Sequence, residues 1–226
     1  MIKSPNQEIT KSSLSCREVT VTRPVMACLD LEGVLVPEIW INVAEATGIG
    51  ELRLTTRDIA DYDLLMKRRL GILDRHHLRL PDIQAVIGKM APLEGAMEFL
   101  GWLRERCQVI ILSDTFDQFA HPLMKQLGWP TLFCNTLEVD QSGRITNYHL
   151  RLPEQKRQSV TALKSLRFNV VAVGDSYNDT SMLAEAEAGI LFRPPDTIIK
   201  EFPQFPVTRT YPELKAAFCR AGGLRP

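Results

Sequence analysis

The sequence predicts an α/β protein whose core is a doubly wound, mostly parallel sheet, with a small helical cap inserted after the first strand. Three short apolar runs, at residues 25–29, 109–112 and 170–173, have the composition of strands buried on both faces. Helical patterns separate these runs, and a long segment without a clear strand follows the first of them. Strands that alternate with helices favour a parallel sheet with right-handed crossovers.

Each of the three apolar runs stops at a polar or acidic residue. The first ends at Asp30, the second at Ser113 and Asp114, and the third at Gly174 and Asp175. Ligands of open α/β sheets bind outside the carboxyl ends of the strands, so we expect these groups to converge there. Four segments have the spacing of core helices: 93–106, 118–127, 159–166 and 180–186.

Residues 40–88 carry apolar residues at helical spacing but no convincing strand. The segment is too long for a loop between a strand and a helix, so we assign it to a helical cap. Residues 24–39 and 89–226 then form the α/β core. Because the cap begins soon after Asp30, it can cover the expected site.

Three smaller segments complete the prediction. Residues 1–23 are polar and have no sustained period, which is typical of a flexible leader. Residues 137–152 have the pattern of two short strands joined by a turn at 140–143, which predicts a hairpin. A last helix is expected near residues 213–219.

The composition excludes several classes of protein. The 226 residues include 27 basic and 27 acidic side chains, so no overall field attracts nucleic acid or an anionic membrane. The five cysteines have no C-x-x-C spacing, which favours reduced thiols in a cytoplasmic protein. No apolar run approaches the roughly 18 residues of a membrane span. We therefore expect a cytoplasmic protein that binds neither nucleic acid nor membrane.

Two acidic clusters predict a metal site. Asp30 and Glu32 follow the first strand, although such a pair alone is more often a solvated loop. Asp175 and Asp179 follow another strand, and hard oxygen ligands from two strand ends suit Mg²⁺. We favour metal binding for Asp175 and a supporting position for Asp179. The alternative is that Asp179 or Asn178 caps the helix that begins near residue 180.

Two further side chains are candidates for phosphate binding. Ser113 lies at the end of a strand and ahead of a helix, where its hydroxyl and the following amides can hold phosphate oxygens. Lys156 can neutralise a phosphate and the carboxylate that attacks it. Its neighbour Arg157 is the rival for that function, and a lysine in a charged run is usually solvated surface.

Four ordered motifs resemble those of the haloacid dehalogenase superfamily of phosphohydrolases. They are DLEGV at 30–34, SDTF at 113–116, the lysine at 156 and GDSYND at 174–179. The resemblance covers nearly all of residues 25–192. It is closest to the phosphoserine phosphatase branch, and within it to members that also transfer the phosphoryl group from phosphoserine to L-homoserine. Further matching segments are PLEG at 92–95, KRQS at 156–159 and EFPQFP at 201–206.

The resemblance implies a function for each motif residue. Asp30 is expected to attack phosphorus and to form an aspartyl phosphate. Mg²⁺ is expected to be held by Asp30, the backbone carbonyl of Glu32 and Asp175, with Asp179 in support. The residues implied in binding the phosphoryl group are Ser113, Asp114, Lys156 and Asn178, with Asn178 and Asp179 also orienting Lys156 and a metal-bound water.

The second acidic residue departs from the usual motif. Most phosphatases of this superfamily carry aspartate there, whereas this chain has Glu32, a residue shared with the bifunctional branch. A glutamate is one methylene longer but can still protonate the leaving serine alkoxide, provided that burial and a neighbouring carboxylate keep it protonated. The longer side chain of Glu32 alters the geometry of the general acid and base, but a carboxyl group that can fill this function is still present.

The resemblance also implies the substrate-binding residues of the cap. Glu38 is expected to bind the ammonium group of O-phospho-L-serine or L-homoserine, Arg69 to bind its carboxylate, and Tyr62 to line the cap. Glu38 could instead cap the following helix, and Arg69 could lie on a solvated helical face. Two other functions stay open: a phosphatase for another small phosphomonoester, and a non-catalytic phosphometabolite-binding protein. A homodimer is one expectation for the oligomeric state.

Overall fold

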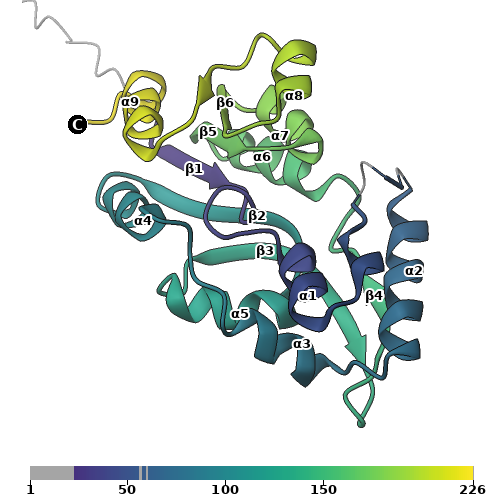
Figure 1. The fold of residues 1–226 in the computed structure, drawn as a ribbon. Coiled ribbons are helices and arrows are strands. Elements are labelled where there is room, and N and C mark those ends of the chain that lie inside the picture. Colours follow the sequence, from purple (N-terminus) through teal and green to yellow (C-terminus); the bar gives the residue numbers. More distant parts are fainter. Residues whose placement is uncertain (1–22, 56–57, 60, 226) are drawn as a thin grey trace, which may run out of the picture.

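The computed structural model describes residues 23–55, 58–59 and 61–225 (Figure 1). The predicted leader, residues 1–23, lies outside the described residues except for Arg23. Within the described part of the chain, no helix is both long and apolar enough to cross a membrane.

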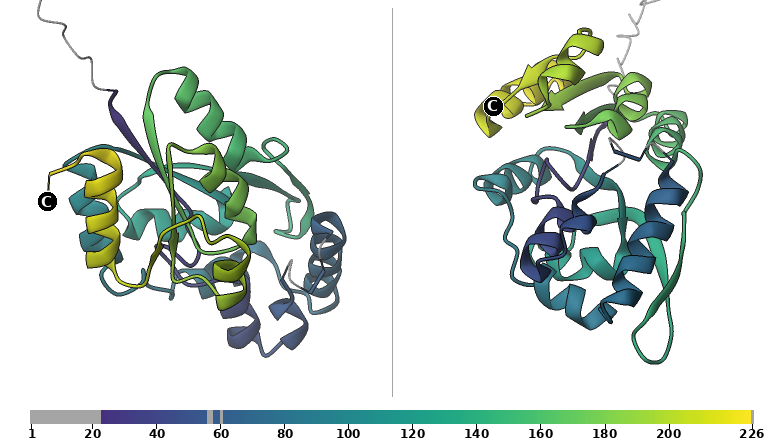
Figure 2. Two further views of the ribbon diagram at one scale, coloured as in Figure 1. Left: turned by 90° about the horizontal axis from the view of Figure 1, so that it is seen from above. Right: turned by 45° about the vertical axis from the view of Figure 1, so that its right-hand side comes forward.

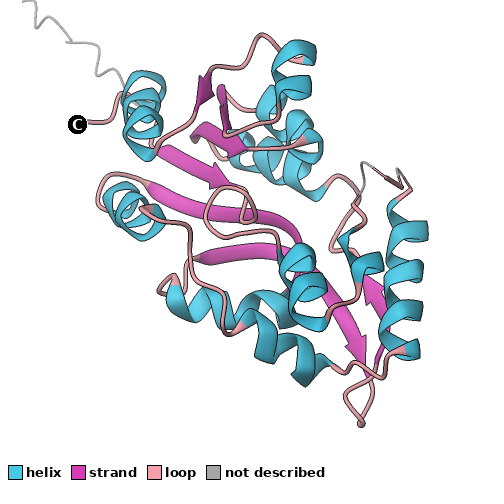
Figure 3. Ribbon diagram, in the orientation of Figure 1, coloured by secondary structure: helices cyan, strands magenta, loops and turns pink. Residues whose placement is uncertain are grey.

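Seven strands form one sheet in the order β4-β3-β2-β1-β5-β6-β7 (Figure 3). All neighbours are parallel except β3 and β4. The strands are β1 Val25–Leu29, β2 Gln108–Phe116, β3 Thr131–Val139, β4 Ile145–His149, β5 Asn169–Gly174, β6 Ala188–Phe192 and β7 Val207–Thr208. The predicted doubly wound, mostly parallel sheet is confirmed, and so is the hairpin, which is made by β3 and β4.

Helices cover both faces of this sheet, and the alternation of side chains along each strand explains how (Figure 2). In β1, Ala27 and Leu29 pack with the helices on one face, whereas Met26 and Cys28 pack with those on the other. The first face is covered by α4 Ala96–Arg104, α5 Asp117–Gln126 and α9 Tyr211–Gly222, and the second by α6 Gln155–Ser165, α7 Thr180–Glu185 and α8 Asp196–Glu201. Burial on both faces accounts for the continuous apolar runs in the sequence.

The segment between β1 and α4 is helical, as predicted. It contains α1 Ile39–Thr47, the short 3-10 helix η1 Gly50–Arg53, α2 Tyr62–Arg75 and α3 Leu80–Ile87. The division into a core and a cap at residues 40 and 88 stays a prediction. In Figure 1 these helices lie at the end of the sheet where β1 and β2 terminate.

The register of the central strands brings the ends of β1 and β5 level with the middle of β2. The strand β2 continues through Ser113 and Asp114 to Phe116, beyond its predicted end at residue 112. Leu29 of β1 lies opposite Ile111 of β2 and Val173 of β5. The polar residues that follow, Asp30 and Asp175 among them, therefore meet at this edge. The helix α6 begins at residue 155, earlier than the predicted 159, because its first turn is buried and packs against the site.

Candidate active site

Asp30 lies at the centre of the site, directly after β1. Its backbone amide donates to the carbonyl of Val173, 2.9 Å away, and its carboxylate accepts a hydrogen bond from the amide of Leu31 at 2.7 Å. The side chain is buried. Burial raises the pKa of the Asp30 carboxyl well above its usual range, and Asp179 adds to this effect while Lys156 opposes it.

Lys156 is buried among three carboxylates. Its Nζ lies 2.8 Å from Asp179 Oδ1, 3.0 Å from Asp30 Oδ1 and 3.5 Å from Asp114 Oδ2. Burial by itself would lower the pKa of Lys156, but the three carboxylates outweigh it and hold that pKa well above its ordinary value. The ammonium group therefore stays charged beside Asp30. The side chain of the rival Arg157 is 40% exposed and pairs with Glu154 instead.

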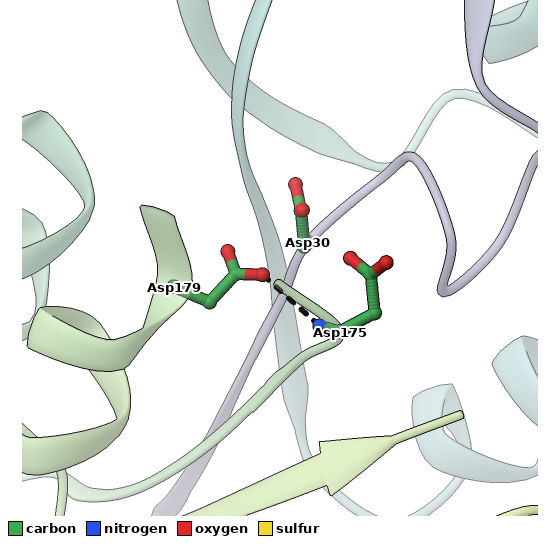
Figure 4. A group of neighbouring side chains, drawn as sticks. All are labelled: Asp30, Asp175 and Asp179. Carbon is green, nitrogen blue, oxygen red and sulfur yellow. Dashed lines mark hydrogen bonds between the residues drawn. The ribbon is translucent and has the colours of Figure 1, made fainter. Parts of the chain in front are cut away.

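Three aspartates could hold a metal ion. Asp30, Asp175 and Asp179 each offer an oxygen, and these atoms lie within 4.8 Å of one another (Figure 4). The close approach of Gly33 to Asp175 supports a built site, since a Cβ at Gly33 would lie 2.4 Å from Asp175 Cγ and its φ of +74° favours glycine. An all-oxygen set of this kind fits Mg²⁺.

Asp179 differs from the other two aspartates. It is completely buried, and its Oδ2 accepts hydrogen bonds from the amides of Asp175 and Ser176 at 3.0 and 3.1 Å (Figure 4). Its Oδ1 pairs with Lys156. These contacts suit a residue that fixes Lys156 and the loop after β5. Asp179 makes no capping hydrogen bond to α7 itself. Its side chain instead completes the capping box of the short 3-10 helix η2 Tyr177–Asp179, which leads into α7, so the predicted capping alternative holds for that turn.

Ser113 and Asp114 interrupt β2 at the same level. Asp114 Oδ2 accepts from Asn178 Nδ2 at 2.9 Å, so the described partner of this asparagine amide is Asp114 and not Lys156. Burial raises the pKa of Asp114, but Lys156, Asn178 and Gln155 outweigh it and bring that pKa below its usual value. Asp114 is therefore an anion held in place by three donors.

Glu32 is placed by the first cap helix. Its Oε2 accepts a hydrogen bond from the amide of Ile39 at 2.8 Å, the first residue of α1. Glu38 occupies the N-cap position but makes no capping hydrogen bond with its side chain, so the alternative of a Glu38 cap is wrong. Burial and the neighbouring Glu38 raise the pKa of Glu32 to about 8, against the lowering by Ile39 and Arg69. This environment favours the protonated form of the Glu32 carboxyl at neutral pH.

Arg69 faces the site from α2. Its side chain is buried, its Nη2 donates to the carbonyl of Leu54 at 2.7 Å, and its guanidinium lies 4.4 Å from the centre of the Trp40 ring. The alternative of a solvated helical face is therefore wrong. Among the described residues, no carboxylate pairs with this guanidinium within 4.0 Å, and its Nε has no hydrogen-bond partner. Burial lowers the pKa of Arg69 to about 10, although Tyr62, Glu32 and Glu38 raise it.

One cavity of about 890 Å³ brings these groups together. Every predicted site residue except Asp179 lines it: Asp30, Glu32, Glu38, Tyr62, Arg69, Ser113, Asp114, Lys156, Asp175 and Asn178. The Tyr62 hydroxyl donates to the carbonyl of Asp114 at 3.3 Å, which connects α2 to the phosphate end of the cavity.

Gln155 and Trp40 are among the cavity residues that sequence reasoning missed. Gln155 is buried and donates from Nε2 to the Ser113 carbonyl at 2.6 Å and to Asp114 Oδ1 at 3.3 Å. Its position next to Lys156 was the available signal. Trp40, which stacks with Arg69, lies two residues after Glu38, and a large aromatic at that place in the motif could have been noticed.

Comparisons with known proteins show the family of the chain. Residues 26–187 match the family model of haloacid dehalogenase-like hydrolases. The chain is 64% identical over 196 residues to a protein of Pseudomonas aeruginosa named phosphoserine phosphatase ThrH, covering 87% of this chain and 96% of the relative. It is also 64% identical to a phosphoserine phosphatase of Pseudomonas syringae pathovar tomato, over 87% of this chain and 83% of the relative.

A solved structure supports the fold. A crystal structure of phosphoserine phosphatase in its apo form matches with a TM-score of 0.70 at 24% identity, covering 86% of this chain and 98% of the other. At that identity the likeness concerns the fold alone. The family match and the two relatives at 64% identity carry the assignment: the chain belongs to the haloacid dehalogenase-like hydrolases.

Proposed function

We propose that this chain is a Mg²⁺-dependent phosphoserine phosphatase that works through a phosphorylated Asp30. The observation that carries the proposal is a shared cavity that has a buried carboxylate and ammonium at one end. At its other end lies a buried guanidinium that has no carboxylate partner among the described residues. The two relatives named phosphoserine phosphatase support the same substrate. The four-carbon alcohol L-homoserine is proposed as a second acceptor.

The first half-reaction follows from the positions of Asp30 and Glu32. The attack requires Asp30 as a carboxylate, a form that Lys156 favours against burial and that a bound cation would favour further. An oxygen of this carboxylate attacks phosphorus while the bond to the serine oxygen breaks, which leaves an aspartyl phosphate. The protonated carboxyl of Glu32 gives its proton to the departing serine oxygen. Lys156, beside Asp30, offsets negative charge on the phosphoryl oxygens, and the Ser113 hydroxyl is available to donate a hydrogen bond to one of them.

The second half-reaction uses Glu32 in the opposite direction. As a carboxylate it removes a proton from water or from the hydroxyl of L-homoserine, whose oxygen then attacks the phosphoryl group and releases Asp30. Asp30, Asp175 and the carbonyl of Glu32 would hold Mg²⁺, with Asp179 in support. When bound, the cation supplies positive charge to the transferring group.

The cap residues explain the proposed choice of substrate. Arg69 would take the carboxylate of the amino acid, because a buried guanidinium needs an anion to balance its desolvation. Glu38 would take the ammonium group. Tyr62 and Trp40 form walls beside these two groups. Serine and homoserine share the ammonium and carboxylate, so the same residues serve both. The homodimer and the cytoplasmic location stay predictions.

The direct test is to incubate the enzyme with Mg²⁺ and O-phospho-L-serine, with and without L-homoserine, and to follow phosphorus by NMR. We expect inorganic phosphate in both reactions and phosphohomoserine in the second. No turnover of phosphoserine would contradict the proposal. Formation of phosphate without phosphohomoserine would restrict the proposal to the phosphatase reaction. If a substrate panel shows a preference for another phosphomonoester, that compound would take the place of phosphoserine in the proposal.

Arg69→Met tests the substrate end of the cavity. The KM for O-phospho-L-serine is expected to rise about 10- to 150-fold, the equivalent of about 1.5–3 kcal/mol for a hydrogen bond to a charged group. O-phosphoethanolamine lacks the carboxylate, so its kcat/KM is expected to stay nearly the same. Steady-state kinetics on both substrates make the comparison. Equal losses on the two would show that Arg69 does not bind the carboxylate.

A further inference from the structure

The helix α2 presents different residues on two of its faces. Tyr62, Leu65 and Arg69, at positions i, i+3 and i+7, line the cavity. Asp63 and Asp74 lie near opposite ends of the helix and point to the β3–β4 hairpin instead. In Figures 1 and 2 the helix runs beside β4, and it also packs against η1.

The hairpin holds both ends of α2. The Tyr148 hydroxyl donates to Asp63 Oδ1 at 2.7 Å near the start of the helix. Arg144 donates from Nε and Nη2 to the two carboxylate oxygens of Asp74, at 2.7 and 3.0 Å, near its end. These two parallel hydrogen bonds fix the orientation of the Arg144 guanidinium relative to the Asp74 carboxylate as well as the distance between them. The Tyr148 ring also packs edge-on against Tyr62, with 5.9 Å between ring centres.

The turn of the hairpin is itself fixed, so it can serve as a support. Asp140 Oδ1 accepts hydrogen bonds from the amides of Ser142 and Arg144 at 2.8 and 3.1 Å. The backbone carbonyl of Gly143 accepts a hydrogen bond from the amide of Leu80, the first residue of α3, at 2.8 Å. Gly143 has a φ of +80°, which favours glycine. The turn therefore delivers Arg144 in a defined position and contacts the cap at a second helix.

We propose that Tyr148 and Arg144 are positioning residues for substrate binding: from outside the cavity, they fix α2 and thereby the placement of Arg69 and Tyr62. The inference rests on the proposed function, in which Arg69 binds the substrate carboxylate. Asp30 and Lys156 belong to core elements, so the chemical step does not depend on the hairpin contacts. The expected signature is a higher KM with little change in kcat.

The kinetic test uses Tyr148→Phe, Asp74→Asn and the double variant. Each single change is expected to raise the KM for phosphoserine about 2- to 5-fold, since both pairs are partly exposed, and the double change about 4- to 25-fold. Arg144→Lys keeps the charge but loses the two parallel hydrogen bonds, and is expected to fall between wild type and Asp74→Asn. Inorganic phosphate has no carboxylate for Arg69 to bind, so its competitive inhibition is expected to be unchanged.

Glu51→Gln is the matched control. Glu51 of η1 pairs with Arg75 of α2 at 3.1 Å, an exposed carboxylate–guanidinium pair inside the cap that does not involve the hairpin. The KM of the Glu51→Gln variant for phosphoserine is expected to stay near that of wild type. An unchanged KM in the hairpin variants, an equal rise in Glu51→Gln, or weaker phosphate inhibition by the same factor would overturn the proposal.

Hydrogen exchange separates this proposal from the assignment of substrate. In the absence of any substrate, amides of α2 are expected to exchange faster in Tyr148→Phe and in the double variant than in wild type, while those of α6 keep their rates. Unchanged exchange in α2 would refute the positioning function even if phosphoserine is turned over. If α2 exchanges faster in these variants but the wild type does not turn over phosphoserine, the hairpin still supports α2. That outcome would reject only phosphoserine as the substrate.

Discussion

Asp30→Asn is expected to lower phosphoserine turnover by about 10⁴-fold or more, the range seen when a nucleophile is removed. The amide is a poor nucleophile, so no aspartyl phosphate forms. It has nearly the shape of the carboxylate and its oxygen can still accept the hydrogen bond from Leu31. The fold is therefore expected to persist. Phosphate release in steady state, with thermal unfolding of both proteins, makes the measurement.

The same variant separates an enzyme from a binding protein. If the cavity serves only to bind a phosphometabolite, Asp30→Asn would keep the function. We expect it instead to bind phosphoserine without consuming it, which calorimetric titration can detect. Turnover within tenfold of wild type, in a correctly folded variant, would remove Asp30 from the position of nucleophile.

Lys156→Met is expected to lower the free energy of unfolding by about 3–5 kcal/mol. The change leaves the buried Asp30 and Asp179, and the partly exposed Asp114 beside them, without the ammonium group that balances them. Removing one partner of a buried ion pair leaves the other charge desolvated, which is the costly part. Urea unfolding in the presence of a chelator measures the difference without a contribution from bound cation. Turnover is expected to fall as well, because the phosphoryl oxygens lose their counter-charge.

Lys164→Met is the matched control on the same helix. Lys164 pairs with Glu185 at 3.3 Å, and about a third of its side chain is exposed. Solvent screens such a pair, so the expected loss is about 1 kcal/mol or less. Equal losses in the two variants would show that the buried cluster contributes no more than a surface ion pair.

The sheet and the position of Asp30 at its edge could be predicted because their signals are local. Burial on both faces requires continuous apolar runs, and the residue after such a run lies at the carboxyl edge of the sheet, as Asp30 and Asp175 do. The choice of Lys156 over Arg157 could not be made in this way. Both stand in one charged run, and only the packing of α6 buries the first and exposes the second.

The opening motif shows the same division. The sequence by itself determined that a buried strand ends at Asp30, that Glu32 follows it and that a helical segment comes next, since each depends on neighbours along the chain. Only the tertiary structure decided that Glu32 accepts the first amide of α1 and lies partly buried beside Glu38. It also decided that Arg69 lies against Trp40 without a carboxylate partner among the described residues, and that Tyr148 and Arg144 contact α2 from the hairpin. These contacts join residues far apart in the chain, and their desolvation and pairing depend on three-dimensional packing that no local pattern records.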